Sequence, residues 1–495
     1  MEKTQVDKLI EKYGFDLEET HISWVLIGKD TVYKIKKPVN FGFLDYSSLE
    51  KRLKFCKQEI ELNSRLAKDM YLGISKITKQ ENEISIDEEG DIIEYAVKMK
   101  KIPQDRMMDL LIRQNKIEES HINALAKIIA NFHKNAETND YILSFGSIET
   151  NKTNTDENFE QTKNAIGDYI TEYQYNSIFT YTNQFYKKEE NLFQHRIKTK
   201  KIKDCHGDMY SRNICIISEE EIYIYDCIEF NERFRYSDVA SDVAFMLMDL
   251  ENYSRYDLSD LFLKYYLEYS KDDTLYDIVT FYKIYRAYVR GKIAFFQQNK
   301  KEANNYFDLA FGYLPKQFKP KLILMSGLTG SGKSYIADRL SKSIDAVVLN
   351  SDSIRKELLG MDKFQKDLSD FQKGIYSKEI TDTVYNTLKT KAYDTLKDGK
   401  NVILDATYLT KKQRNDVETF MKRLNIKPVV IFVDVDDETA KKHFQKRESQ
   451  KSVSDGRFEI YIKQKEILEK PKNCIRVNPK NNINAILNEI IDNIK

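Results

Sequence analysis

Short apolar runs alternate with amphipathic helical stretches along the last third of the chain. Runs such as "KLILMSG", "NVILDAT" and "KPVVIFVDVD" have the length and composition of strands that are buried on both faces, and each is followed by a stretch with helical spacing of its apolar residues. Strands that alternate with helices in this way form a parallel sheet covered by helices. The pattern therefore predicts an α/β domain at the C-terminal end.

The pattern before this region is different. "SWVLIGKDTVYKIKK" has strand-like sequence on both sides of a short turn and predicts a β-hairpin, and "SSLEKRLKFCKQEIELNSRLA" predicts a helix. The strand "IIEYAVKMKKI" then leads into largely helical sequence. We expect an α+β domain over residues 1–315 and an α/β domain over residues 316–495, which meet near "GYLPKQFKPKL".

Composition adds limits on the class of protein. With 41% hydrophobic residues in 495, the chain can bury more than one core. Its five cysteines are scattered without a C-x-x-C pair, which disfavours a disulfide framework or a zinc site. The first residues are charged, and no run reaches the roughly 18 apolar residues of a membrane span. We therefore expect a cytoplasmic protein with no membrane segment.

Charge is distributed unevenly along the chain. Residues 321–495 contain 33 Lys and Arg against 25 Asp and Glu, although the whole chain has a net charge of only +1. A basic half can bind an anionic partner such as nucleic acid, and it can equally be a solvated surface. The sequence has no aromatic platform typical of RNA-binding domains, so nucleic acid is the weakest of the partners considered.

The segment "GLTGSGKS", residues 327–334, follows the first predicted strand of the α/β domain. It fits the phosphate-binding pattern G-x-x-x-x-G-K-[ST], in which backbone N–H groups at a helix N-terminus point at a nucleotide phosphate. Lys333 is expected to reach the β- and γ-phosphates of ATP, and Ser334 is expected to bind Mg²⁺. The residues predicted to contact ATP here are Gly327, Thr329, Gly330, Ser331, Gly332, Lys333 and Ser334.

Acidic residues stand at or just after the ends of two further predicted strands, where open α/β sheets bind ligands. Asp405 ends "NVILD" and suits an indirect contact with Mg²⁺; because Ala406 follows it, the Asp-Glu pair of hydrolytic motors is missing. Asp352 can accept a proton from a substrate hydroxyl, and Arg355 can hold a substrate phosphate. The alternative, a helix-capping Asp352 with a solvated Arg355, stays open.

These motifs resemble the P-loop kinases related to polynucleotide 5′-kinases, zeta toxins and gluconate kinases, over most of residues 321–495. The resemblance implies that Asp352 and Arg355 form the Asp-x-x-Arg pair that activates the substrate hydroxyl. It also implies a basic lid, for which "FQKRESQKSVSDGRFEIYIKQ" is the candidate. Arg447 and Arg457 in this stretch are expected to stabilise the transferring phosphoryl group.

A second set of candidate residues lies in the first 315 residues. In "CHGDMYSRN", Asp208 precedes Asn213 by five positions, the spacing of a kinase catalytic loop, and Asp226 ends the strand-like "EIYIYD" thirteen positions later. Asp208 is expected to take the substrate proton, and Asn213 and Asp226 to hold Mg²⁺. Lys34, in the hairpin, and Glu59, in the following helix, are expected to pair beside the phosphates of ATP.

The HGD sequence and the "YDCIEFNERFRYSDVASDVAFMLMDLE" that follows resemble the aminoglycoside phosphotransferase-like kinases, over roughly residues 20–300. The resemblance implies a bilobal, protein-kinase-like fold that binds ATP and Mg²⁺. The whole arrangement resembles a bacterial two-domain group in which this kinase-like half precedes a P-loop half. No G-x-G-x-x-G is present, and Asp238 and Asp242 are assigned no catalytic role.

The sequence thus predicts a bifunctional ATP-dependent phosphotransferase with two ATP–Mg²⁺ sites and small-molecule hydroxyl acceptors. One alternative is a P-loop kinase, acting on a small molecule or a polynucleotide 5′-hydroxyl, with a regulatory nucleotide-binding N-terminal domain. Another is nucleic-acid binding or 5′-end repair by the basic half. Neither the acceptor nor the oligomeric state is predicted.

Overall fold

The computed structural model describes residues 1–42, 44–362, 365, 373–448 and 456–494. The chain divides into two compact units: unit 1 comprises Met1–Gln161 and Thr182–Arg290, and unit 2 comprises Thr162–Tyr181 and Gly291–Lys495. The divisions fall at the end of helix α6 and within α7 (Glu172–Lys188) and α12 (Leu275–Phe296). The predicted domain boundary at residue 315 stays a prediction.

Unit 1 contains a six-stranded antiparallel sheet in the order β1-β2-β3-β6-β4-β5. The predicted hairpin is β2 and β3, whose turn is closed by the Gly28 N–H donating to the Thr31 carbonyl over 2.8 Å. Helix α2 (Leu49–Asn63) connects β3 to β4 and starts at a Ser48 cap. The strands are β1 (Asp16–Glu19), β2 (Ser23–Ile27), β3 (Thr31–Lys36), β4 (Tyr71–Gln80), β5 (Glu83–Ile86) and β6 (Asp91–Lys100).

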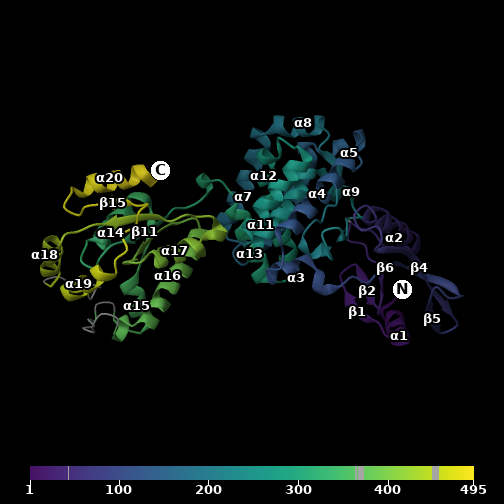
Figure 1. The fold of residues 1–495 in the computed structure, drawn as a ribbon, viewed down its shortest axis with the longest axis horizontal. Helices are drawn as coiled ribbons and strands as arrows, with labels where there is room; N and C mark the ends of the chain where they lie inside the picture. The colour runs from purple at the N-terminus through teal and green to yellow at the C-terminus, as the bar shows by residue number, and fades with distance from the viewer. Residues whose placement is uncertain (43, 363–364, 366–372, 449–455, 495) are drawn as a thin grey trace. The chain divides into compact units, whose positions relative to one another are not determined.

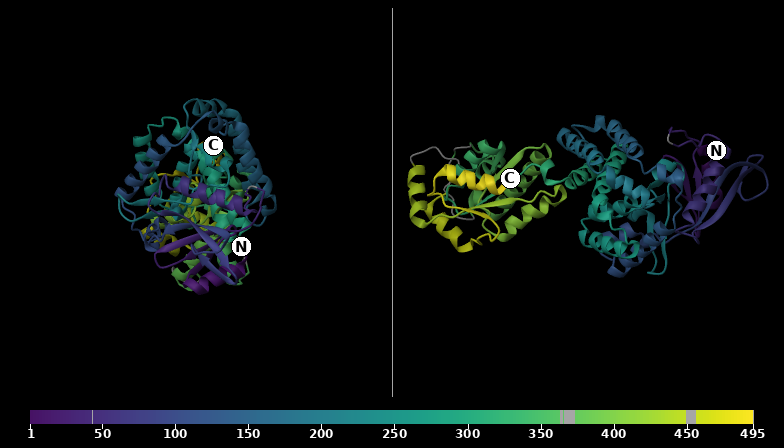
Figure 2. Two further views of the ribbon diagram at one scale, coloured as in Figure 1. Left: turned by 90° about the vertical axis from the view of Figure 1, so that its right-hand side faces the viewer. Right: turned by 90° about the horizontal axis from the view of Figure 1, so that it is seen from above.

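The rest of unit 1 is mainly helical and lies together beyond the sheet (Figures 1 and 2). Its core packs α4, α11 and α12 around α10, in which every residue from Val239 to Glu251 is buried. Helix α1 (Lys3–Tyr13) instead packs on the sheet through Val6 and Leu9. The helices of the helical part are α3 (Met108–Arg113), α4 (Glu119–Asn135), α5 (Asp140–Ser144), α6 (Ile148–Gln161), α8 (Glu190–Lys198), α9 (Glu232–Arg235), α10 (Val239–Asn252) and α11 (Tyr256–Ser270). Four short strands form two small sheets, β7 (Ile202–Asp204) with β10 (Tyr236–Asp238), and β8 (Ile214–Ile216) with β9 (Ile222–Ile224).

Unit 2 is built on a five-stranded sheet in the order β12-β13-β11-β14-β15, and every neighbouring pair is parallel. The predicted parallel α/β domain is therefore confirmed, with strands where the apolar runs indicated. Placing β11 between β13 and β14 brings the loop after β11 to the middle of the sheet's carboxyl edge. The strands are β11 (Leu322–Ser326), β12 (Ala346–Asn350), β13 (Asn401–Asp405), β14 (Val429–Val433) and β15 (Ile475–Val477).

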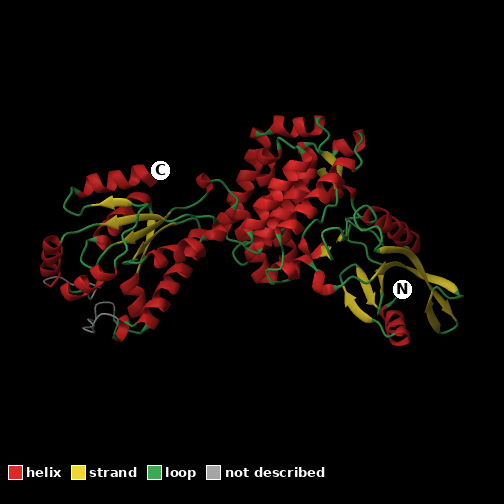
Figure 3. Ribbon diagram, in the orientation of Figure 1, coloured by secondary structure: helices red, strands yellow, loops and turns green. Residues whose placement is uncertain are grey.

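Helices cover both faces of this sheet (Figures 1 and 3). On one face, Ile336 and Leu340 of α14 pack with Ile490 of α20 against the strands. In Figure 1, α16 and α17 lie on the side of the sheet away from α20. The helices are α13 (Lys300–Gly312), α14 (Lys333–Ile344), α15 (Ser351–Leu358), α16 (Lys378–Lys397), α17 (Lys411–Phe420), α18 (Asp437–Glu448), α19 (Phe458–Ile467) and α20 (Ile483–Ile494).

Two segments from before the parallel sheet belong to unit 2, and they share a buried polar contact with α16. The Asp308 carboxylate in α13 accepts from Gln174 Nε2 over 2.8 Å and from the Tyr393 hydroxyl over 2.7 Å, and it pairs with Lys397 at 2.8 Å. Asp308 is 4% exposed, so these three donors replace the water that it loses on burial.

The five cysteines are free thiols, and four of them are buried. Among the described helices, none has the length and the apolar character that crossing a bilayer requires.

Candidate functional site

A cavity of about 670 Å³ opens in unit 2 at the carboxyl ends of β11, β12 and β13. The loop between β11 and α14 forms one wall, and α15, α16 and α17 form another. Parallel α/β sheets bind their ligands at this edge. The cavity therefore joins the predicted phosphate-binding loop to a second wall made by other elements. The predicted residues that line it are Thr329, Gly330, Gly332, Lys333, Ser334, Asp352, Arg355 and Asp405.

The loop itself requires glycine at two positions. Gly327 has φ +137°, and a Cβ there would lie 2.6 Å from the Val433 carbonyl oxygen. Gly330 has φ +76°, and its Cβ would lie 2.4 Å from the ring of Phe444 in α18. Other residues are strained at such φ values and would displace these neighbours. The loop is thus held closely between β14 and α18, with its backbone facing the cavity.

The donors of this loop match the charge of a nucleotide phosphate. Lys333 is 7% exposed, and its Nζ donates to the Leu328 carbonyl within the loop over 2.7 Å. The Thr329 N–H donates to Oε1 of Gln464 over 2.8 Å. A buried ammonium group and loop N–H groups at the start of α14 favour an anion. The residues present therefore fit the phosphates of ATP.

Oxygen ligands suited to Mg²⁺ lie at the ends of the neighbouring strands. Asp405 ends β13, is 3% exposed and accepts from Asn350 Nδ2 over 2.7 Å. Asn350 ends β12, and its Oδ1 accepts the Ser353 N–H over 2.9 Å, which caps α15. Mg²⁺ prefers carboxylate and hydroxyl oxygens, so Asp405 and Ser334 fit this ion. Asn350 was missed from the sequence, although its position before "SDSIR" is typical of a helix cap.

The predicted pair Asp352 and Arg355 lies on α15 at the cavity wall. Asp352 Oδ1 accepts from the Tyr376 hydroxyl at 3.5 Å, a long contact. Arg355 is only 4% exposed; it donates to the Ile375 carbonyl over 2.9 Å and to Thr381 Oγ1 over 3.3 Å. The guanidinium group is therefore anchored beside the cavity, and the solvated alternative for Arg355 is wrong.

The two lid candidates stand on either side of residues that the structure does not describe. Arg447 belongs to α18, and its side chain lies outside the described part of the chain. Arg457 immediately precedes α19, and its neighbours Gly456 and Ile460 line the cavity. The lid role of both arginines stays a prediction.

In unit 1, Lys34 brings together the predicted ATP-binding residues. Its Nζ lies 2.9 Å from Glu59 Oε1 and 2.7 Å from Asp226 Oδ1. Lys34 comes from β3, Glu59 from α2 and Asp226 from the loop after β9, so three separate elements meet at one ammonium group. Asp226 has φ +64°, which turns the chain immediately after β9.

A second lysine, Lys36, lies on the same strand face and was assigned no role from the sequence. Lys36, with its side chain 1% exposed, bonds Glu59 Oε2 at 2.5 Å, pairs with Glu229, and lies 3.3 Å from the Tyr46 hydroxyl. Against the effect of burial, the carboxylates of Glu229 and Glu59 raise the pKa of Lys36 well above its ordinary value. Glu59 therefore stands between two charged lysines and holds α2 against β3.

The loop "CHGDMYSRN" places Asp208 and Asn213 in contact. Asn213 Nδ2 donates to Asp208 Oδ2 over 3.0 Å and to the Asp208 carbonyl over 2.9 Å. Burial raises the pKa of Asp208 to about 6; Arg290 opposes the shift and the Asp226 carboxylate adds to it. A carboxyl group with its pKa near neutrality is suited to accepting a proton.

Asp242 fixes the backbone of this loop. Its carboxylate accepts the N–H of His206 over 2.8 Å and the N–H of Gly207 over 3.0 Å. Burial lowers the pKa of His206 to about 4, so its imidazole is neutral. Its bonding partners assign the proton to Nε2, which donates to the Tyr225 carbonyl over 3.1 Å, while Nδ1 accepts the Asp208 N–H over 3.3 Å.

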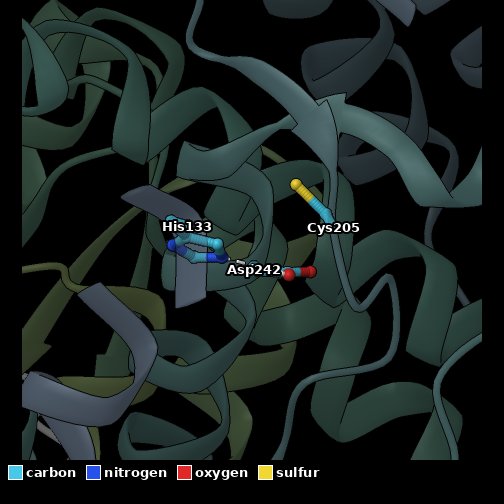
Figure 4. A group of neighbouring side chains, drawn as sticks. All are labelled: His133, Cys205 and Asp242. Carbon is cyan, nitrogen blue, oxygen red and sulfur yellow. Dashed lines mark hydrogen bonds and ion pairs between the residues drawn. The ribbon is translucent and has the colours of Figure 1, made fainter. Parts of the chain in front are cut away.

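Figure 4 shows Asp242 beside His133 and Cys205, a buried group whose ligand atoms lie within 4.8 Å of one another. These potential ligand atoms nevertheless already interact with other groups of the protein or are protonated. Both Asp242 oxygens accept loop N–H groups, His133 Nδ1 bonds the Tyr266 hydroxyl at 2.8 Å, and burial raises the pKa of Cys205 well above its ordinary value. The cluster is a structural polar network, because a metal would need a thiolate and free lone pairs.

Two mycobacterial proteins align with most of this chain. The uncharacterized proteins Rv2004c of Mycobacterium tuberculosis and Mb2027c of Mycobacterium bovis are each 31% identical to it over 399 residues, which is 79% of this chain and 78% of each relative. This chain belongs to their family. Within it, residues 322–471 match the family model described as the AAA domain, so this family member carries a P-loop α/β domain in unit 2.

Solved structures align with about a third of the chain. A gluconokinase from Sinorhizobium meliloti 1021 is 16% identical, with a TM-score of 0.26, over 35% of this chain and 90% of its own. The Mycobacterium tuberculosis APS kinase CysC, in complex with AMPPNP and APS, is 20% identical, with a TM-score of 0.27, over 36% of this chain and 98% of its own.

Proposed function

We propose that unit 2 is an ATP-dependent phosphotransferase that moves the γ-phosphoryl group of ATP to a hydroxyl group of a small molecule. The observation that carries the proposal is that the cavity of about 670 Å³ is lined both by the phosphate-binding loop and by Asp352, Arg355 and α16–α17. Hydrolysis needs room for a water molecule only. A cavity that continues past the loop to a second polar wall has room for an acceptor.

Different residues of unit 2 have different roles in the proposed transfer. Lys333 and the loop N–H groups stabilise the negative charge of the transferring phosphoryl group. Asp352 accepts the proton of the acceptor hydroxyl, and Arg355 and the Tyr376 hydroxyl lie beside it on the same wall. When bound, Mg²⁺ neutralises phosphate charge, and Ser334 and Asp405 would hold it.

The acceptor wall is polar and carries both signs of charge. Side chains of this kind hydrogen-bond a molecule with several hydroxyl groups, and the basic ones can hold an acidic group on it. A polynucleotide 5′-hydroxyl is the alternative acceptor. The wall is contributed by Lys378, Asp382, Asn386, Lys389, Lys412, Gln413 and Asp416.

ADP formation by the full chain tests this function. We expect an extract of small metabolites to stimulate ADP formation, and Lys333→Ala and Asp352→Asn each to remove the stimulated part. Stimulation by oligonucleotides with a free 5′-hydroxyl, and not by the extract, would select the alternative acceptor. ADP formation that neither addition changes would contradict transfer to an acceptor.

We also infer a second nucleotide site in unit 1. The geometry at Lys34 supports it, because this lysine pairs with Glu59 at 2.9 Å and with Asp226 at 2.7 Å, and kinase-like proteins use a Lys–Glu pair to bind ATP phosphates. The sheet with α2 inserted between β3 and β4, followed by the helical part with Asp208 and Asn213, agrees with the resemblance to aminoglycoside phosphotransferase-like kinases.

Binding stoichiometry tests the second site. We expect the full chain to bind two molecules of a Mg²⁺–ATP analogue, and Lys333→Ala and Lys34→Ala each to leave one. If the second site is catalytic, Asp208→Ala abolishes a labelled product that Lys333→Ala leaves intact. If it is regulatory, Asp208→Ala keeps all products, and Lys34→Ala changes only the rate of the unit 2 reaction. Binding of only one molecule by the unaltered chain would contradict the proposed second site.

A further inference from the structure

A buried hydrogen bond links helix α19 to the phosphate-binding loop. Oε1 of Gln464 accepts the backbone N–H of Thr329 over 2.8 Å. Gln464 is 8% exposed and Thr329 is 9% exposed, and both line the cavity. The two residues are 135 positions apart in the sequence, so the fold alone brings them together.

Backbone N–H groups of this loop are the donors that a nucleotide phosphate requires. A buried N–H group that loses its acceptor costs free energy, so the Thr329 N–H needs one partner at all times. The amide oxygen of Gln464 and a phosphoryl oxygen are competing acceptors for the same hydrogen. We propose that Gln464 is a positioning residue that holds the Thr329 N–H until a nucleotide phosphate replaces it.

The rest of α19 remains attached to the loop during such an exchange. Tyr461, one turn before Gln464, is fully buried in an apolar cluster with Leu328, the residue that precedes Thr329. The Tyr461 hydroxyl also donates to Asp437 of α18 over 2.8 Å. Positions i and i+3 share a helix face. This face of α19 therefore shares with the loop an apolar cluster that persists and a hydrogen bond that is exchanged, so nucleotide occupancy is coupled to α19.

This inference rests on the proposed ATP site of unit 2, and substitution of Gln464 in the full chain tests it. Affinity for Mg²⁺–AMPPNP is measured by calorimetry, and the unit 2 affinity is the one that Lys333→Ala abolishes. Gln464→Leu removes the competing acceptor at similar volume, so we expect the unit 2 affinity to become about two- to tenfold tighter. The free protein is expected to melt at a lower temperature, because the Thr329 N–H loses its partner.

Two further variants separate this role from a purely structural one. Gln464→Glu keeps an acceptor for the Thr329 N–H but adds negative charge beside the phosphates, so we expect unchanged melting of the free protein and at least tenfold weaker AMPPNP binding. If Gln464→Leu fails to fold, this variant decides the question. Lys463→Leu, at an exposed position of the same helix, is the control and is expected to bind as the unaltered chain does.

Unchanged or weaker AMPPNP binding by folded Gln464→Leu would overturn the inference, and so would Gln464→Glu that binds as tightly as the unaltered chain. Either result would leave the proposed function of unit 2 intact. Absence of any binding that depends on Lys333 in the unaltered chain would overturn both.

Discussion

The side-chain amide of Asn350 donates to the Asp405 carboxylate over 2.7 Å and links the ends of the neighbouring parallel strands β12 and β13. The oxygen of the same amide caps α15 by accepting the Ser353 N–H over 2.9 Å. Helix α15 carries Asp352, the proposed base, while Asp405 is the proposed Mg²⁺ contact. One side chain therefore fixes the phosphate side and the acceptor side of the cavity relative to each other.

Removal of this link is expected to impair transfer more than stability. Asn350→Ala loses the cap, which lowers the free energy of unfolding by about 1 kcal/mol, and it frees the Asp405 carboxylate. We expect phosphate transfer to fall at least tenfold. Asn350→Ser is the matched control, since Ser still caps α15 but is too short to reach Asp405. It should unfold close to the unaltered chain in urea and transfer as poorly as the Ala variant; full transfer by either would show that the link has no role.

Two glycines of the phosphate-binding loop allow the effect of backbone strain to be distinguished from the effect of side-chain packing. Both Gly330 and Gly332 have positive φ, but a Cβ at Gly330 would lie 2.4 Å from Phe444, whereas at Gly332 the nearest atom, in Pro479, is 3.7 Å away. We expect Gly330→Ala to lower the free energy of unfolding of unit 2 by about 1–3 kcal/mol more than Gly332→Ala, because only the former displaces the ring. Phe444→Leu in the Gly330→Ala chain should recover part of the loss. Equal denaturation midpoints for the two single variants would contradict this packing.

Lys36 is expected to contribute mainly to stability. Lys36→Met leaves the buried carboxylates of Glu59 and Glu229 without their shared cation, and breaking a buried pair costs about 3–5 kcal/mol. Lys152→Met, which removes an exposed pair with Asp156, should leave the denaturation midpoint nearly unchanged. Against burial, Lys34 and Lys36 lower the pKa of Glu59 to about 2. The stabilisation is thus present above about pH 4.3, the ordinary value, and is lost as the pH falls toward 2.

Asp208 is expected to have the opposite pH dependence. Because burial raises the pKa of its carboxyl group to about 6, the folded protein holds the proton more tightly than the unfolded chain. Its contribution to stability is therefore present below about pH 4 and is lost as the pH rises through 6. Asp208→Asn should raise the free energy of unfolding at pH 7 by up to about 3 kcal/mol and, if unit 1 is catalytic, abolish the labelled product of that unit.

Urea denaturation at pH 4, 6 and 8 checks this prediction. The difference between Asp208→Asn and the unaltered chain should grow with pH and level off above 7. A difference that is constant with pH would show that folding does not change the pKa of Asp208. Any transfer by unit 1 should rise with pH through about 6, since the base must be deprotonated.

The contiguous motifs were predictable because the chemistry of each lies within a few residues. "GLTGSGKS" specifies a turn, a helix start and a cation together, and "CHGDMYSRN" places Asp208 and Asn213 five positions apart. Asn350, Gln464 and the pair of Lys36 with Glu229 were missed, since their partners lie 55, 135 and 193 positions away. Hydrophobic periodicity shows which face of an element is buried but not what covers it. For the same reason, the sequence did not indicate that residues 162–181 belong with α13 and the parallel sheet.

Arg355 is a further residue whose surroundings could not be predicted from the sequence. The Asp-x-x-Arg spacing was compatible with a solvated side chain and with a substrate-binding one. Its bonds to the Ile375 carbonyl and Thr381, and its position 4.5 Å from the centre of the Tyr376 ring, depend on how η5 (Gly374–Tyr376) and α16 fold over α15.

Transfer of label from γ-³²P-ATP tests the central claim most directly. The full chain is incubated with Mg²⁺, labelled ATP and a small-metabolite extract, and the labelled products are separated by mass from inorganic phosphate. We predict a labelled small molecule that is made by the unaltered chain and is lost in Lys333→Ala and in Asp352→Asn. Label found only in inorganic phosphate, or a labelled molecule that persists in Lys333→Ala, would contradict a phosphotransferase in unit 2.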